Sequence, residues 1–321
     1  MRWGIAGYGD IVTRRALPAL HALGEQPVAL WGRDPHRAAL VAERHAVARS
    51  GADPRVLLSD VDAVYVATPV ATHVPLARAV LAAGIPVLVE KPLAGGLATG
   101  AAFDTAAPDT AWPCAGVAYY RRLAPAVRRL RAELAGWTPE RVEAHFRCAF
   151  EPGPDDPMRW RTDPAVSGGG VLADAGSHRI DLLLHLFGRP YEMTARLGGR
   201  FPRGAERRAD LTLRWRTGLR AHCLMEWGEG PPVDRVELTG GGRTVTLDPL
   251  DAGRLTGLAG TPLLLPPAAN PHQPLLADFA AAVATGGTPV CPVAEARLVD
   301  DVIVAAERSD AAGGAPVRLV H

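Results

Sequence analysis

The sequence predicts an α/β protein in two parts: a parallel sheet wrapped by helices, then an α/β domain with a mostly antiparallel open sheet. Across residues 1–120, short apolar runs alternate with stretches of helical periodicity, which is typical of parallel β–α units. From about residue 211, apolar residues recur at every second position, as in antiparallel strands with one buried face. We therefore predict domains at 1–120 and 121–321, with C-terminal helices that pack back on the first domain.

Composition narrows the class of protein. The 321 residues are 48% hydrophobic and 21% charged, which is enough for two domains with a core each. A net charge of +1 gives no electrostatic reason to expect nucleic acid or an anionic membrane as a partner. The four cysteines are far apart and form no Cys-x-x-Cys pair, so neither a disulfide framework nor a zinc knuckle is predicted. The chain shows no basic segment followed by an apolar run at its start and no window of 18 apolar residues, so we expect a cytoplasmic protein.

A glycine turn separates the first strand from the first helix. The apolar run Trp3–Ala6 is followed by Gly7–Ile11 and then by a stretch of helical periodicity. This order is the context of a dinucleotide-binding turn, where glycines let the backbone approach a pyrophosphate at a helix N-terminus. Val12 stands where a third small residue is expected, so we expect slightly wider packing of helix on strand there. The alternative is a tight turn without a ligand.

The end of the second strand bears on the choice of cofactor. Val28–Trp31 is followed by Gly32, where an NAD-selective site has a carboxylate for the adenine ribose, and then by Arg33. Asp34 and Pro35 have the pattern of an N-cap and the first residue of a helix. We therefore predict NADP, with Arg33 on its 2′-phosphate and NAD as second choice. The alternative for Arg33 is a solvated loop charge.

Two further strands end in polar residues. Residues 62–66 run into Ala67–Pro69, and His73 precedes the next helix; residues 85–89 deliver Glu90–Pro92. Ligands of open parallel sheets bind beyond the carboxyl ends of strands, so these residues are expected beside the cofactor.

Lys91 is the only lysine in the chain, because the other 34 of the 35 cationic side chains are arginines. Arginine stays charged, whereas the pKa of lysine shifts readily on burial, so the two are not interchangeable in proton chemistry. Either Lys91 has a chemical role, or it is a chance survivor in an arginine-rich chain.

Several motifs together resemble the glucose-fructose oxidoreductase, inositol dehydrogenase and MocA (Gfo/Idh/MocA) family of nicotinamide-dependent oxidoreductases. They are the glycine turn, Ala67–Pro69 with His73, Glu90–Pro92, Tyr119–Pro125, and Trp160–Pro164 with Ser167–Gly170. The resemblance implies a Rossmann domain, a larger α/β domain whose sheet often forms an oligomer interface (a homodimer or homotetramer), and an active site between the domains. The cofactor-binding residues predicted from motifs and resemblance are Gly7, Tyr8, Gly9, Asp10, Ile11, Arg33, Thr68, Pro69, His73, Glu90 and Lys91.

One helix of the second domain carries a second group of polar residues. On a helix that begins near Gly170 and ends at Gly188, Asp174, His178 and Asp181 form one polar stripe. A carboxylate one turn from an imidazole fixes its tautomer and raises its basicity, which suits a proton shuttle. The alternatives are an exposed charge pattern and a metal site that also uses His185, although hydride transfer needs no metal. We expect His185 to be a packing residue and Asp181 to orient a neighbour or line the pocket.

The resemblance assigns Lys91, Asp174 and His178 as catalytic residues. We predict His178 as general acid or base held by Asp174, with Lys91 donating to the substrate oxygen, although the sequence does not decide which of the two moves the proton. The predicted substrate contacts are Tyr120, Arg121, Arg161, Asp174 and His178. The alternative for Tyr120, Arg121 and Arg161 is an interdomain salt bridge or a packing role.

The rest of the second domain is predicted from its periodicity. Two hairpins are expected, 211–215 with 219–227, and 236–238 with 245–247 around a triple-glycine turn. Their apolar face needs a cover, either from the chain's own helices or from a partner subunit. We expect an irregular crossing at 251–272, helices at 275–283 and 294–306, and a final strand at 317–319.

The function predicted is reversible hydride transfer between NADP and a keto or hydroxyl carbon of a sugar, nucleotide-sugar or cyclitol. The resemblance leaves two alternatives, a redox-neutral glycoside hydrolase that uses NAD and a non-catalytic sensor that binds NAD(P). A proton relay argues against the sensor, because a sensor does not need one.

Overall fold

The computed structural model describes residues 1–103, 113–258 and 262–319, which form two compact units. The first unit contains Met1–Ala94, Ala102–Tyr120 and Ala268–Arg297. The second contains Gly95–Ala101, Arg121–Pro267 and Leu298–His321. Within the described residues, no helix is both long and apolar enough to cross a membrane.

The first unit is built on a parallel sheet in the order β3-β2-β1-β4-β5-β6, the strand order of a Rossmann fold. This confirms the fold class predicted for the first part. The strands are β1 (Arg2–Ala6), β2 (Gln26–Trp31), β3 (Arg49–Gly51), β4 (Ala63–Val66), β5 (Val87–Val89) and β6 (Ala115–Val117). The helices are α1 (Leu17–Ala22), α2 (Pro35–Arg44), α3 (His73–Ala82) and α7 (His272–Thr285).

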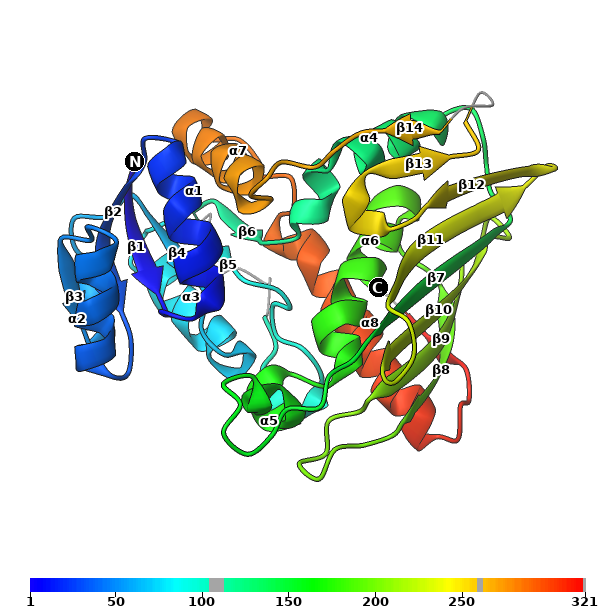
Figure 1. Ribbon diagram of the computed structural model, residues 1–321, viewed down its shortest axis with the longest axis horizontal. Coiled ribbons are helices and arrows are strands. Elements are labelled where there is room, and N and C mark those ends of the chain that lie inside the picture. The colour runs from blue at the N-terminus through cyan, green and yellow to red at the C-terminus, as the bar shows by residue number, and fades with distance from the viewer. Residues whose placement is uncertain (104–112, 259–261, 320–321) are drawn as a thin grey trace. The chain divides into compact units, whose positions relative to one another are not determined.

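Helix boundaries in this unit follow the local chemistry of the sequence. The Asp34 carboxylate accepts from the amides of His36 and Arg37, which confirms it as the N-cap of α2. We expected His73 to lie before this helix, but it is the first residue of α3. Helix α7 is far from α1 in the sequence but lies beside it in the structure (Figure 1). Phe279 of α7 packs on Trp3 of β1, with the two ring centroids 5.8 Å apart.

The second unit is built on a sheet in the order β14-β13-β12-β11-β7-β10-β9-β8-β15, in which only β7 and β10 are parallel neighbours among the described strands. Both predicted hairpins are present, and Val236 faces Leu247 as expected. Strands β7 and β8 were not predicted, and residues 251–272 are less irregular than expected because β13 and β14 lie there. The strands are β7 (Arg141–Cys148), β8 (Glu192–Gly198), β9 (Arg208–Arg214), β10 (Arg220–Trp227), β11 (Val233–Gly240), β12 (Arg243–Leu247), β13 (Arg254–Thr256), β14 (Leu263–Leu264) and β15 (Val317–Arg318).

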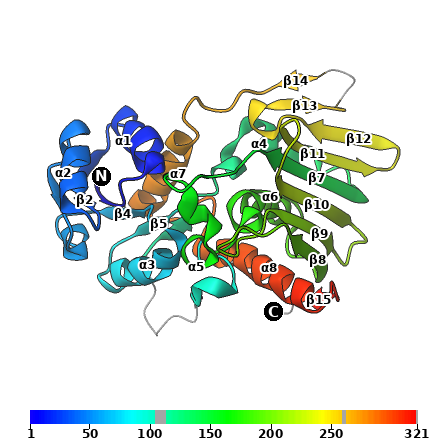
Figure 2. The ribbon, with the colours of Figure 1, turned by 60° about the horizontal axis from the view of Figure 1, so that its bottom comes forward.

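The two faces of this sheet differ in chemistry. One face carries the apolar residues of the predicted alternation, such as Leu211, Cys223 and Met225, which are fully buried. Helices α6 and α8 lie along that face (Figures 1 and 2), so the chain covers it with its own helices. The other face is polar and carries Glu143 and His222. The helices assigned wholly or mainly to this unit are α4 (Pro125–Glu133), α5 (Pro164–Ser167), α6 (Ser177–Phe187) and α8 (Val293–Ala311).

Candidate active site

The two glycines of the first turn have different surroundings. Gly7 has φ +109°, and a Cβ there would lie 2.4 Å from the carbonyl oxygen of Ala67. Glycine is therefore required at position 7 by the packing of β1 against β4. A Cβ on Gly9 would meet no atom within 4 Å, so its glycine leaves open space at the start of the helix. That space, beside backbone amides that begin a helix, fits the pyrophosphate of a dinucleotide.

The end of β2 explains why Gly32 stands where a carboxylate is usual. A Cβ on Gly32 would lie 2.0 Å from the Tyr8 ring, so the tyrosine fills the space that a larger side chain needs. The guanidinium of Arg37 lies over the same ring, 5.1 Å from its centroid. Arg33 and Arg37 are both exposed. This corner of the unit presents two cations and an aromatic ring at the end of β2.

His73 is buried between two strand-end loops and has only 1% of its surface exposed. Its Nδ1 lies 2.9 Å from the Pro92 carbonyl oxygen, and its Nε2 lies 2.8 Å from the Thr68 carbonyl oxygen. Burial lowers the pKa of His73, against the effect of these carbonyls. Both ring nitrogens contact backbone carbonyl oxygens, so the ring connects the loop after β4 to the loop that carries Lys91.

Glu90 is buried beside Lys91 and collects donors from three segments. Its Oε1 accepts from the Tyr65 hydroxyl and from His272 Nε2 at 3.0 Å. Its Oε2 accepts from the backbone N–H of Lys91 at 3.1 Å. The Tyr120 ring lies 5.6 Å from the His272 ring. Glu90, predicted as a cofactor contact, is thus tied to the backbone of Lys91 and to α7.

In the second unit, the helix with the predicted proton shuttle is helical from residue 171 to 187 and contains a π-helical turn at Leu172–Gly176. Such turns are frequently found at functional sites. Asp174 lies in this turn, and its Oδ2 is 3.2 Å from Nη1 of Arg161. His178 and Asp181 are buried, so the alternative of an exposed charge pattern is wrong.

Two predicted polar residues of this unit belong to ion pairs, one of which is buried. The Asp181 carboxylate accepts from Nε and Nη2 of Arg122, and both side chains are 1% exposed. This pair removes Asp181 from the metal-site alternative, and no group of three or more candidate metal ligands lies together in the described residues. Arg121 donates to both oxygens of Asp251 at 3.0 and 2.6 Å, which is a salt bridge within this unit and not the interdomain one given as its alternative.

The glycine run before this helix is explained by packing within the unit. A Cβ on Gly170 would lie 2.0 Å from the Glu206 carbonyl oxygen. The buried Glu206 carboxylate accepts from the amides of Gly170 at 2.9 Å and Leu172 at 3.0 Å. Burial raises the pKa of Glu206, although these amides oppose the shift. At Gly170 the close neighbour is therefore Glu206 of the same unit.

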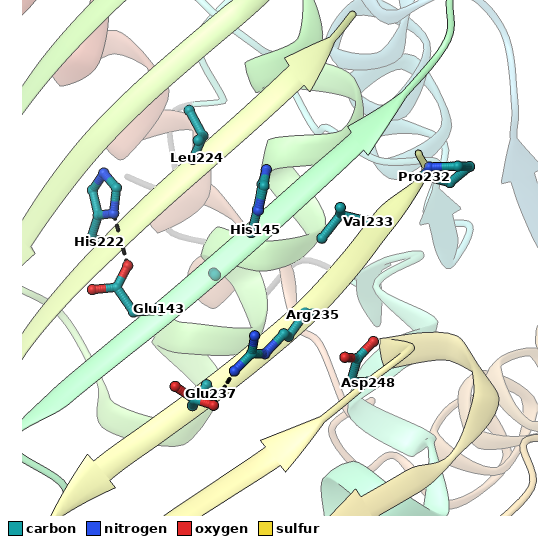
Figure 3. Close-up of a pocket in the computed structure, with 10 residues that line it drawn as sticks. Glu143, His145, His222, Leu224, Pro232, Val233, Arg235, Glu237 and Asp248 are labelled. Carbon is teal, nitrogen blue, oxygen red and sulfur yellow. Dashed lines mark hydrogen bonds and ion pairs between the residues drawn. The ribbon is translucent and has the colours of Figure 1, made fainter. Parts of the chain in front are cut away.

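The polar face of the second sheet has an open hollow of about 490 Å³, shown in Figure 3. His222 lies between Glu143 and Asp210, with ring nitrogens 2.8 and 2.9 Å from their carboxylates. Although burial opposes it, hydrogen bonds from the His222 ring to these carboxylates raise the pKa of His222. None of the predicted site residues lines this hollow, which is made by strands β7, β10 and β11 and nearby loops.

Two functional candidates were missed from the sequence, His272 and Glu206. Each acts across a long separation, 182 residues from Glu90 for His272 and 36 residues from Gly170 for Glu206. The only local signal was that each is a polar residue next to a predicted apolar element.

Comparison with known proteins identifies the class. Residues 1–111 match the model of an oxidoreductase family with an NAD-binding Rossmann fold, and residues 127–245 match the GFO/IDH/MocA C-terminal domain. The D-xylose 1-dehydrogenase (NADP(+)) 2 of Haloferax volcanii is 28% identical, over 96% of this chain and 98% of that protein. Inositol 2-dehydrogenase of Acidothermus cellulolyticus is 33% identical, over 61% of this chain and 55% of its own. The structure of levoglucosan dehydrogenase in complex with NADH has the same fold, with a TM-score of 0.85 at 22% identity over 100% of this chain and 99% of that one.

The fold and the matches define an NAD(P)-dependent oxidoreductase. The chain belongs to the GFO/IDH/MocA family, as the motifs in its sequence indicated.

Proposed function

We propose that this protein is an NADP-dependent oxidoreductase that transfers hydride reversibly between nicotinamide and a keto or hydroxyl carbon of a sugar, nucleotide-sugar or cyclitol. The main support for this proposal is the position of Lys91, the single lysine, at the carboxyl end of β5, where the backbone is held on both sides of it. The backbone N–H of Lys91 is bound by Glu90, and the next carbonyl, of Pro92, is bound by His73. The relatives named D-xylose 1-dehydrogenase and inositol 2-dehydrogenase support CH–OH groups of polyols as the substrate class.

The nicotinamide, when bound, donates or accepts the hydride, so the chain has to orient the substrate carbon and manage one proton. Lys91 donates a hydrogen bond to the substrate oxygen and stabilises the negative charge that develops there. His178 is the general acid or base, and Asp174 holds it. Arg161 reaches Asp174 and thereby orients this group.

The surroundings of Tyr8 support NADP as the cofactor. With the Tyr8 ring against Gly32, residue 32 has no room for the carboxylate that would select the ribose hydroxyl of NAD. Arg33 and Arg37 are exposed near the ring and are suited to bind a 2′-phosphate. Arg37 was not foreseen from the sequence.

The remaining predicted contacts are revised in this proposal. Tyr120 and Arg161 stay as substrate contacts, whereas Arg121 is assigned a structural role because Asp251 binds its guanidinium. We also propose that the chain forms a homodimer or homotetramer through the polar face of the second sheet. The apolar face is covered by the chain's own helices, so the polar face is the one left to a partner. Light scattering that gives only the monomer mass at micromolar concentration would exclude this assembly.

The function is tested by turnover of keto-sugars, cyclitols and nucleotide-activated sugars with NADPH and NADH. Lys91→Arg and His178→Ala are each expected to lower kcat by about 10²-fold or more, because each removes an interaction made in the transition state. Binding of NADPH, followed by its fluorescence, is expected to stay within a few-fold. His185→Ala, on the same helix as His178, is the matched control and should keep its turnover.

Near-normal turnover in Lys91→Arg or His178→Ala would show that the catalytic assignment is wrong. A glycoside that is cleaved without net change in nicotinamide absorbance would instead identify the redox-neutral hydrolase.

A further inference from the structure

The carboxylate of Glu90 is the centre of a buried network beside Lys91. Glu90 is 7% exposed, and Tyr65 and His272, which both donate to its Oε1, are 0% and 3% exposed. Its second oxygen holds the Lys91 amide. A carboxylate so far from water is costly unless donors compensate it. Here strand β4, helix α7 and the backbone of Lys91 itself provide them.

These donors keep Glu90 ionised. Although burial pushes the pKa of Glu90 upward, the hydrogen bond and charge of His272, together with Tyr65 and Lys91, bring it below its ordinary value. Burial and the neighbouring Glu90 charge raise the pKa of Tyr65 well above its usual range, so the phenol remains a donor. His73, on α3, also feels the charge of Glu90. Because a carboxylate only accepts, Nε2 of His272 has to carry a proton.

The chain holds His272 in place by separate contacts. Its backbone N–H donates to Oδ1 of Asn270 at 3.1 Å, and Nδ2 of Asn270 donates to the carbonyl oxygen of Arg15 at 2.8 Å. Arg15 lies in the π-helical turn Val12–Ala16, which follows the glycine turn. The Nδ1 of His272 is buried and has no hydrogen-bond partner among the described residues. Within the described residues, the ring makes its hydrogen bond to Glu90 alone, which indicates that it serves to hold this carboxylate.

We propose that His272 is a positioning residue for hydride transfer: its Nε2–H keeps the Glu90 carboxylate ionised and in place, and Glu90 fixes the backbone and the charge environment of Lys91. The inference rests on the role of Lys91 in the proposed function. It adds that helix α7, from the C-terminal part of the chain, sets the charge environment of the single lysine. The helix does so through one carboxylate, that of Glu90, and without touching the substrate.

The single lysine makes a direct test available. Full-length protein labelled with [¹³Cε]lysine gives one lysine resonance, that of Lys91, and its titration with pH can be followed without substrate. His272→Leu removes the donor, so Glu90 should take up a proton and Lys91 should lose a neighbouring negative charge. The Lys91 resonance should then titrate at a pH lower by about half a unit or more. Glu90→Gln should produce the same shift, and adding His272→Leu to it should add little.

His272→Gln keeps an N–H donor and should restore the wild-type titration, which a loss of mere packing volume would not explain. His45→Leu, at the end of α2, is the control for an unrelated histidine of the same unit. If His272→Leu does not fold, Glu90→Gln and His272→Gln still decide, because only the first is expected to shift the resonance.

An unchanged Lys91 titration in Glu90→Gln, or in a folded His272→Leu, would overturn this inference. It would leave the proposed function intact as long as Lys91→Arg abolishes turnover. Normal turnover in Lys91→Arg would have the opposite meaning, since the function proposed for Lys91 would then fail whatever its titration.

Discussion

Gly7 and Gly9 lie two residues apart in one turn, but only the surroundings of Gly7 require glycine. At Gly7 a methyl group would collide with Ala67, and the backbone has a positive φ of +109°. At Gly9 there is open space within 4 Å. From sequence, both glycines were expected to serve the dinucleotide. In the structure, packing against Ala67 accounts for the glycine at position 7, whereas the space at position 9 is open.

Alanine substitutions should distinguish these two positions. Gly7→Ala is expected to lower the free energy of unfolding by about 2 kcal/mol or more, because it combines a clash with backbone strain. Gly9→Ala should change that free energy by no more than about 0.5 kcal/mol and weaken NADPH binding by roughly 10-fold. Urea unfolding and NADPH fluorescence measure the two effects. A stable Gly7→Ala protein would contradict the packing argument.

Arg33 is the residue on which the NADP assignment depends most directly. Arg33→Ser should weaken NADPH binding by about 10- to 100-fold, the value of a charge-assisted hydrogen bond or two. NADH binding should change by less than about 2-fold, because NADH lacks the phosphate that the guanidinium would bind. Arg44→Ser, at the end of α2, is the control. Equal losses for both cofactors would mean that Arg33 does not read the 2′-phosphate.

At the scale of elements, strands that end in a glycine or a polar motif were predictable from sequence, as for β1, β2, β4 and β5. The hairpins followed from their period of two. Strand β7 was missed although its buried residues Val142 and Ala144 alternate with Glu143 and His145 in the same period of two. Local residues such as Lys91 were found, whereas His272 was missed because its partner is 182 residues away. Local patterns show the strand ends, but the contacts that fix them are long-range.

The helix with Asp174 and His178 depends on Glu206 at its start. The pKa of Glu206 is raised in the folded protein, so its ionisation disfavours folding at pH values above that pKa. This penalty fades as the pH falls and is gone below the unfolded value of about 4.3. Glu206→Gln removes the ionisation. The stability of the wild type relative to Glu206→Gln should therefore rise as the pH is lowered from 8 to 4.

Urea unfolding at several pH values measures this difference. Glu229→Gln, an exposed carboxylate of the same unit, is the control for a simple change of net charge. If the wild type gains no stability relative to Glu206→Gln on acidification, the pKa of Glu206 is not raised in the folded protein.

At the scale of the whole chain, the first unit is not a continuous stretch of sequence. It contains residues 1–94 and 102–120, and it is completed by 268–297. Helix α7 brings Phe279, 0% exposed, against Trp3 of β1, and it brings His272 to Glu90. The nucleotide-binding fold therefore includes a segment that follows strands β7 to β14 of the second sheet in sequence.

Phe279→Ala tests this dependence of the first unit on the C-terminal part of the chain. Loss of a fully buried aromatic side chain is expected to cost about 3–5 kcal/mol. Hydrogen exchange should accelerate in β1 and β4, because both belong to the sheet that α7 covers, while the second unit keeps its protection. Phe150→Ala is the matched control, since Phe150 packs on Trp227 in the second unit at 4.4 Å. Faster exchange spread evenly over both units in Phe279→Ala would mean that α7 does not stabilise the first unit in particular.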